Sequence, residues 1–84
     1  MGMVTENHVS GATGVGVYCG DHSECMIERN VVSGTRSDGT GDRSRTGIGI
    51  VSNYYALAEL DKNVLVGNGR RTAAFSNSRF EPVP

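Results

Sequence analysis

Apolar and polar positions along this chain follow one nine-residue pattern that occurs three times. The three segments are MVTENHVSG at 3–11, MIERNVVSG at 26–34 and ELDKNVLVG at 59–67. Each segment places one Asn between aliphatic residues and ends on Gly, which aligns Asn7, Asn30 and Asn63. A repeat that keeps its columns without gaps indicates stacked copies of one supersecondary unit.

A second repeated block predicts that the unit is built from strands. TGVGV at 13–17 matches TGIGI at 46–50, and β-branched residues alternate with Gly in both blocks. Alternation of this kind is typical of strands, whereas Gly in every window disfavours a helix. The Asn spacings are 30 − 7 = 23 and 63 − 30 = 33 residues, so the second unit is ten residues longer. The excess falls between Gly34 and Thr46.

These patterns predict an all-β fold, a parallel β-helix of about three coils, in one domain over 1–84. The expected coils span about 3–25, 26–58 and 59–80, with the insertion as a loop at 35–45. Asn tolerates left-handed backbone angles, so we expect it at a corner of each coil. The amides of successive coils would then hydrogen-bond to each other as an Asn ladder. The alternative is an antiparallel β-sandwich, which gives no reason for the columns to stay in register.

The run N-x-V-x-G … TGVGV … N-x-V-x-G … TGIGI resembles the right-handed parallel β-helix repeat of pectate lyases and related polysaccharide lyases, hydrolases and alginate epimerases. The resemblance covers nearly all of residues 3–69. It implies a right-handed coil and a saccharide groove walled by long loops. In those families acidic residues hold Ca²⁺, and Arg or Lys acts as a base or binds uronate carboxylates. A shared fold does not by itself make an enzyme, and no catalytic motif of a lyase family matches.

The candidate ligand-binding site lies in the insertion and in the equivalent turn of the next coil. Its residues are Arg36, Asp38, Asp42, Arg43, Arg45, Arg70 and Arg71. Arg presents a planar fork to carboxylates, which suits an acidic polysaccharide. Ca²⁺ needs several oxygen ligands and the insertion supplies only two carboxylates, so we predict no metal and no cofactor. A solvated loop of mixed charge is the alternative that we favour.

The segment YCGDHSEC at 18–25 carries both cysteines of the chain. Cys-x₅-Cys with one intervening His is not a usual zinc spacing. The repeat alignment matches Cys25 with Ala58, as a small buried filler, and Cys19 with Ser52 in a turn. A short disulfide between the two cysteines is the other possibility.

Two aromatic residues, Tyr54 and Tyr55, align with Asp21 and His22 in the same turn of successive coils. An exposed Tyr pair can stack on sugar rings or pack on a neighbouring subunit. We favour packing on a subunit.

Size and charge set the expected partners. A chain of 84 residues with 37 % apolar content builds only a small core, and a formal net charge of −1 argues against nucleic acid or an anionic membrane. We expect no cap before the first coil, so its open edge would self-associate, with a homodimer as the commonest outcome. RFEPVP at 79–84 would act as a stop at the other end, leaving the N-terminal end or a lateral face for association.

The expected function is a saccharide-binding or structural module that assembles with other chains and is not catalytic alone. The alternative is an oligomeric polysaccharide lyase, hydrolase or epimerase that acts on acidic saccharides. A third possibility is a pure assembly module.

Overall fold

The computed structural model describes residues 2–41 and 46–82, and over this part of the chain it contains ten strands and no helix. The described residues therefore hold no helix that could cross a membrane. The strands are β1 (Gly2–Thr5), β2 (His8–Ser10), β3 (Val15–Cys19), β4 (Glu24–Glu28), β5 (Val31–Ser33), β6 (Ile48–Ser52), β7 (Leu57–Asp61), β8 (Val64–Val66), β9 (Arg70–Ala74) and β10 (Arg79–Glu81).

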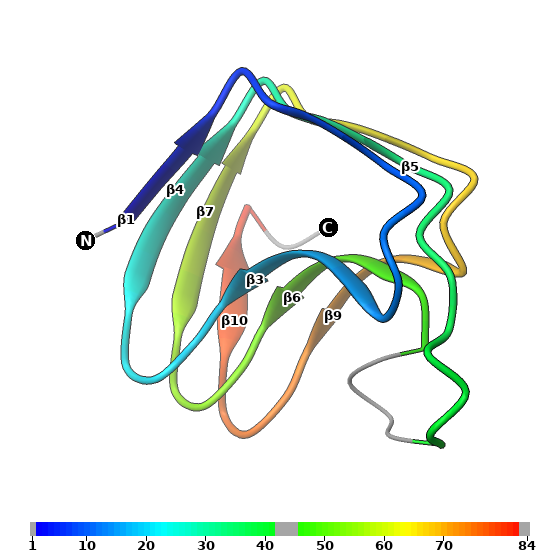
Figure 1. Cartoon of the computed structure of the whole chain (residues 1–84). Coiled ribbons are helices and arrows are strands. Elements are labelled where there is room, and N and C mark those ends of the chain that lie inside the picture. The colour runs from blue at the N-terminus through cyan, green and yellow to red at the C-terminus, as the bar shows by residue number, and fades with distance from the viewer. Residues whose placement is uncertain (1, 42–45, 83–84) are drawn as a thin grey trace.

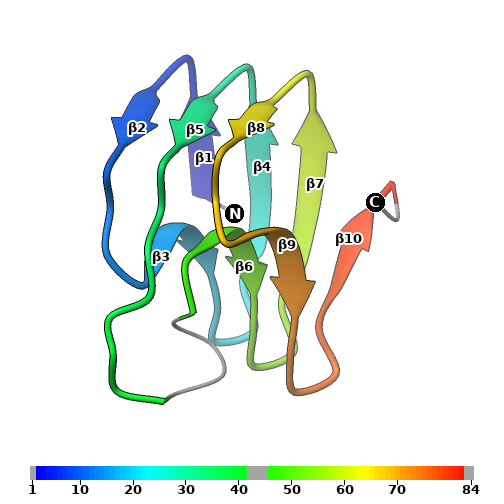
Figure 2. The same ribbon diagram turned by 90° about the vertical axis from the view of Figure 1, so that its right-hand side faces the viewer.

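Every third strand joins the same sheet. The described strands form three sheets with the orders β1-β4-β7-β10, β2-β5-β8 and β3-β6-β9, and every pairing is parallel. The chain therefore winds through three faces per coil, and β10 begins a fourth coil (Figure 1). Figure 2 shows β2, β5 and β8 side by side above β3, β6 and β9. This arrangement is consistent with a small parallel β-helix and is not that of an antiparallel sandwich.

The strand register follows the columns of the sequence repeat. Val4 pairs with Ile27 and Ile27 with Leu60, while Val9 pairs with Val32 and Val32 with Leu65. Equivalent residues of successive coils meet because a pairing shifted by one residue would turn these two apolar columns from the inner face to the outer face.

The core lies inside the coils and is centred on the second one. Ile27, Val32 and Ile50 are fully buried there, and Phe80 of β10 packs into the same cluster. A second cluster contains Ile48 and Val51, both fully buried, with Ala73, Val15 and Phe75 against them. Val51 alternates with the inward-facing Ile50, so it faces the outside of β6.

The Asn residues sit inside the corner between the first two strands of each coil. The Oδ1 atom of the fully buried Asn30 accepts hydrogen bonds from the Asn7 backbone N–H at 3.0 Å and from Asn7 Nδ2 at 3.2 Å. Asn30 uses its own backbone N–H and Nδ2 in the same way toward Asn63 Oδ1, at 3.0 and 3.1 Å. Each amide thus links one coil to the next.

The prediction that Asn itself takes the left-handed angle at this corner is wrong. Positive φ values fall on the residue before each Asn, namely Glu6 (55°), Arg29 (51°) and Lys62 (55°). A charged side chain at the bend points to solvent, and the following Asn can then direct its amide inward. The left-handed conformation costs about 1–2 kcal/mol per residue, so the amide hydrogen bonds must offset it.

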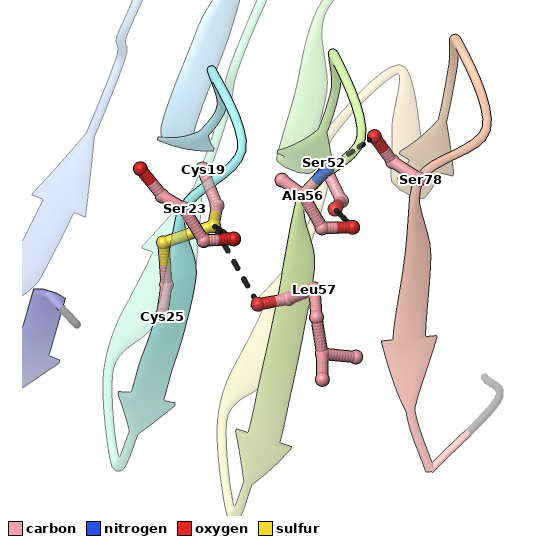
Figure 3. The surroundings of a disulfide bond; sticks show 7 residues. All are labelled: Cys19, Ser23, Cys25, Ser52, Ala56, Leu57 and Ser78. Atoms are coloured by element: carbon pink, nitrogen blue, oxygen red, sulfur yellow. Dashed lines mark hydrogen bonds between the residues drawn. A yellow bond between two sulfur atoms is a disulfide. The ribbon is translucent and has the colours of Figure 1, made fainter.

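Cys19 and Cys25 form a disulfide across the turn from β3 to β4 (Figure 3). The Sγ atom of Cys19 also lies 3.7 Å from the carbonyl oxygen of Leu57 in the third coil. At the equivalent place of the second coil, Ser52 Oγ donates a hydrogen bond to the Ala56 carbonyl at 3.1 Å. Of the possibilities that the sequence left open for the two cysteines, the structure forms the disulfide.

Candidate functional site

Beyond the third coil, the described residues supply one strand, β10. It continues the sheet that contains β1, β4 and β7, while β8 and β9 are the last described strands of their sheets. Figure 2 shows β10 beyond β7. Among the described strands, the outer edges of β8 and β9 therefore have no partner, and such edges offer backbone donors and acceptors.

A hollow of about 430 Å³ lies at this edge and is here named the terminal hollow. Its lining residues are Leu60, Lys62, Asn63, Leu65, Arg71, Thr72 and Pro82. Leu60 and Leu65 belong to the columns whose second-coil members, Ile27 and Val32, are fully buried. The terminal hollow therefore occupies the position where the core of a further coil would lie.

The polar groups of the terminal hollow also repeat those of the coil interior. Asn63 Nδ2 donates to the carbonyl oxygen of Ile27 at 2.7 Å, as Asn30 Nδ2 does to that of Val4 at 2.8 Å. The Asn63 Oδ1 atom accepts from the backbone N–H of Asn30, and among the described residues no Asn side chain accepts in the same way from the backbone N–H of Asn63.

Two cations, Lys62 and Arg71, stand among the residues that line the terminal hollow, and no acidic residue is among them. Arg71 and the next residue along β9, Thr72, both line the terminal hollow. Arg70 is exposed and does not line the hollow. These two residues of the predicted site therefore face different surroundings.

The rest of the predicted ligand-binding residues lie in and around the insertion. Arg36 is exposed and forms an isolated parallel bridge with Thr13. Asp38 Oδ1 accepts hydrogen bonds from the backbone N–H and the hydroxyl of Thr40, at 2.9 and 2.7 Å. The other three members, Asp42, Arg43 and Arg45, lie outside the described residues. Among the residues that the structure describes, no group of three His, Cys, Asp or Glu side chains could hold a metal ion.

Sequence reasoning did not assign Leu60, Leu65, Thr72 or Pro82 to a site. Leu60 and Leu65 share columns with the buried Ile27 and Val32, so the sequence pattern alone does not distinguish them from core residues. Pro82 follows Phe80 by two residues, as Leu60 follows Ala58, so it occupies the matching place in the partial fourth coil.

No protein-family model, curated protein or solved structure matches this chain.

Proposed function

We propose that this chain is a structural module, a right-handed parallel β-helix with a continuous Asn ladder, that assembles with a second copy of itself. The proposed interface is the terminal hollow and not the N-terminal end or lateral face that the sequence favoured. The observation that carries the proposal is the hollow with its apolar floor of Leu60 and Leu65. Apolar side chains at an open coil end, beside unpaired strand edges, favour association because a partner covers both at once. The module has no catalytic activity of its own.

Closed two-fold symmetry suits the half-covered end. In each copy the described residues supply one strand, β10, to the layer beyond the third coil, and β8 and β9 are the last described strands of the other two sheets. Two copies facing each other fill one shared layer with two β10 strands. Phe80 is already buried within its own copy, so the partner has to cover Leu65 and the edges of β8 and β9.

The test places a charge at each end of one apolar column. Val9 and Leu65 are the first and last members of the column that runs through Val32, and both are partly buried. Leu65→Lys should give a monomer by light scattering at micromolar concentration, whereas the matched control Val9→Lys should stay a dimer. A monomeric wild-type chain with a cooperative melt would refute the proposal, and loss of the dimer in Val9→Lys alone would assign the interface to the opposite end.

Binding of an acidic polysaccharide is the second candidate function, favoured by Lys62 and Arg71 at the terminal hollow. Opposite charge and the planar Arg fork suit uronate carboxylates. Tetragalacturonate should bind the wild-type chain and bind Arg71→Gln at least several-fold more weakly. Ultraviolet absorbance of a newly formed double bond in the same samples tests the alternative that the assembled protein is a lyase.

A further inference from the structure

All three tyrosines of the chain, which has no Trp, lie at one corner of the coils. Tyr18 is on β3, and Tyr54 and Tyr55 form the turn between β6 and β7. Their residues are 47 %, 51 % and 58 % exposed. The ring of His22, from the equivalent turn of the first coil, stacks on Tyr55 with centroids 5.2 Å apart and planes 7° from parallel. These four rings are named the aromatic corner.

The backbone holds the aromatic corner in place. The turns of successive coils hydrogen-bond to each other, from the His22 N–H to the Tyr54 carbonyl at 2.8 Å and from the Tyr55 N–H to the Ser76 carbonyl at 3.0 Å. Asn53 Oδ1 accepts from the Tyr54 N–H at 2.8 Å. A ring surface fixed in this way needs little ordering when it binds a ligand.

The two turn tyrosines occupy a backbone conformation that disfavours them. Their φ values are 54° for Tyr54 and 61° for Tyr55, in the left-handed region where a bulky side chain is an outlier. The same two positions hold Asp21 and His22 in the first coil and Ser76 and Asn77 in the third, all with positive φ. Burial does not explain the Tyr pair, because both residues are more than half exposed. Strain of this kind is concentrated at functional sites.

Polar groups border the rings. Burial raises the pKa of Tyr18, and the charges of Asp21 and Tyr54 raise it further, while a hydrogen bond with Asn53 opposes the shift. Asp21 directly precedes His22 in the first-coil turn, and Asn53 directly precedes Tyr54 and accepts a hydrogen bond from its N–H, so both residues border the aromatic corner. A surface of flat apolar faces with a carboxylate and hydroxyls at its edge matches a pyranose ring, whose C–H face is apolar and whose hydroxyls radiate from its rim.

We propose that the aromatic corner binds neutral saccharides, with a pyranose ring on the exposed faces of Tyr54 and Tyr55 and sugar hydroxyls bonded to Asp21. The negative charge of Asp21 disfavours uronates, so this ligand differs from the acidic saccharide considered for the terminal hollow. The site lies on the turns and not at the coil end. Its failure and the failure of the assembly proposal can therefore be observed separately.

Tyrosine fluorescence provides the readout, because every fluorescent side chain of this kind belongs to the aromatic corner. Titration of the full chain with β-1,4- and β-1,3-linked glucan hexasaccharides should give a saturable change with at least one of them. Tetragalacturonate should not compete with it. The double variant Tyr54→Asn/Tyr55→Asn should weaken binding at least tenfold by calorimetry, while its melting temperature stays equal or rises because Asn suits left-handed angles.

The matched control Tyr54→Phe/Tyr55→Phe keeps the ring faces and should bind within about threefold of the wild-type chain. No response to either neutral glucan would overturn the proposal, as would full binding by the Asn variant or loss of binding in the Phe variant. A different result is a tyrosine fluorescence that changes with protein concentration in the absence of sugar, in the wild-type chain and not in Tyr54→Asn/Tyr55→Asn. That result would identify the aromatic corner as a protein interface and overturn the proposal. The Leu65→Lys variant should bind glucan normally.

Discussion

The second-coil amide, Asn30, should be the most costly of the three Asn residues to remove. Asn30→Ala deletes four side-chain hydrogen bonds: two accepted from Asn7, one donated to the Val4 carbonyl and one donated to Asn63 Oδ1. Asn7 is exposed and can turn to water, so the lasting loss lies with the two bonds donated into the coil interior. A net hydrogen bond contributes about 1 kcal/mol and a buried orphan costs about 1–3 kcal/mol. We expect a loss of about 2–3 kcal/mol in unfolding free energy.

Urea unfolding followed by far-ultraviolet circular dichroism measures this loss, and a thermal melt should move down by about 10–20 °C for a chain of this size. The matched control is Asn7→Ala, which removes the same side chain from the exposed first position of the column. It should cost less than about 1 kcal/mol, because its donors reach water in either state. Equal losses in the two variants would show that the amides act independently of burial, and the reasoning from the hydrogen-bond chain would be wrong.

Three further predictions concern the insertion, the pH dependence and the disulfide. Deleting residues 37–46 joins Arg36 to Gly47, as Thr13 precedes Gly14 in the first coil. The melting temperature should shift by only a few degrees, because closure entropy depends weakly on loop length. A large fall in the melting temperature by calorimetry would show that the loop packs on the coils. Burial, followed by the charges of Asp21 and Tyr54, raises the pKa of Tyr18, so the folded state keeps this proton to a higher pH than the unfolded state does. This contribution to stability is complete below about pH 10 and is lost as pH rises through the folded pKa. In an ultraviolet titration Asp21→Asn should lower the pKa of Tyr18, and an unchanged curve would contradict Asp21 as a source of the shift. The double variant Cys19→Ser/Cys25→Ala replaces the disulfide by the residues that the repeat has at the equivalent positions, Ser52 and Ala58. It should lower the unfolding free energy by about 2 kcal/mol, because the loop is no longer closed in the unfolded chain. Equal stability in urea would show that the turn is held without the covalent link.

The register of the strands could be predicted from the sequence because each coil meets the same surroundings. A residue inside a stack of coils has a coil on either side, so similar side chains suit equivalent positions. The sequence therefore shows the columns Val4–Ile27–Leu60 and Val9–Val32–Leu65, which pair in the structure. The parallel sheets follow from that repetition. The same reasoning assigned the left-handed backbone angle to Asn because Asn tolerates that angle. In the structure the residue before each Asn takes it, and the Asn amide points inward to hydrogen-bond between coils.

The candidate site was harder to predict because Leu60 and Leu65 have the same chemistry as Ile27 and Val32, the buried members of their columns. Leu60 and Leu65 line the terminal hollow, whereas Ile27 and Val32 are fully buried. A column in the sequence does not show which of its members are covered. Arg70 and Arg71 are adjacent in sequence, and of the two only Arg71 lines the terminal hollow.

The turn from the third strand of one coil to the first strand of the next shows how a repeat can carry function without losing its fold. The backbone of this turn is the same three times, with two left-handed residues in each coil. The hydrogen bonds from His22 and Tyr55 to the turn of the next coil join main-chain atoms. The side chains at the two left-handed positions are exposed in all three coils, so they are free to differ. Asp21, Ser76 and Asn77 are residue types that suit turns, whereas Tyr54 and Tyr55 work against the backbone angle that they adopt. At these two positions the repeat tolerates an unfavourable residue and gains no burial from it. Selection for binding is therefore best separated from selection for folding here. The Tyr54→Asn/Tyr55→Asn variant tests that separation, because it should combine lower affinity for the saccharide with equal or higher stability.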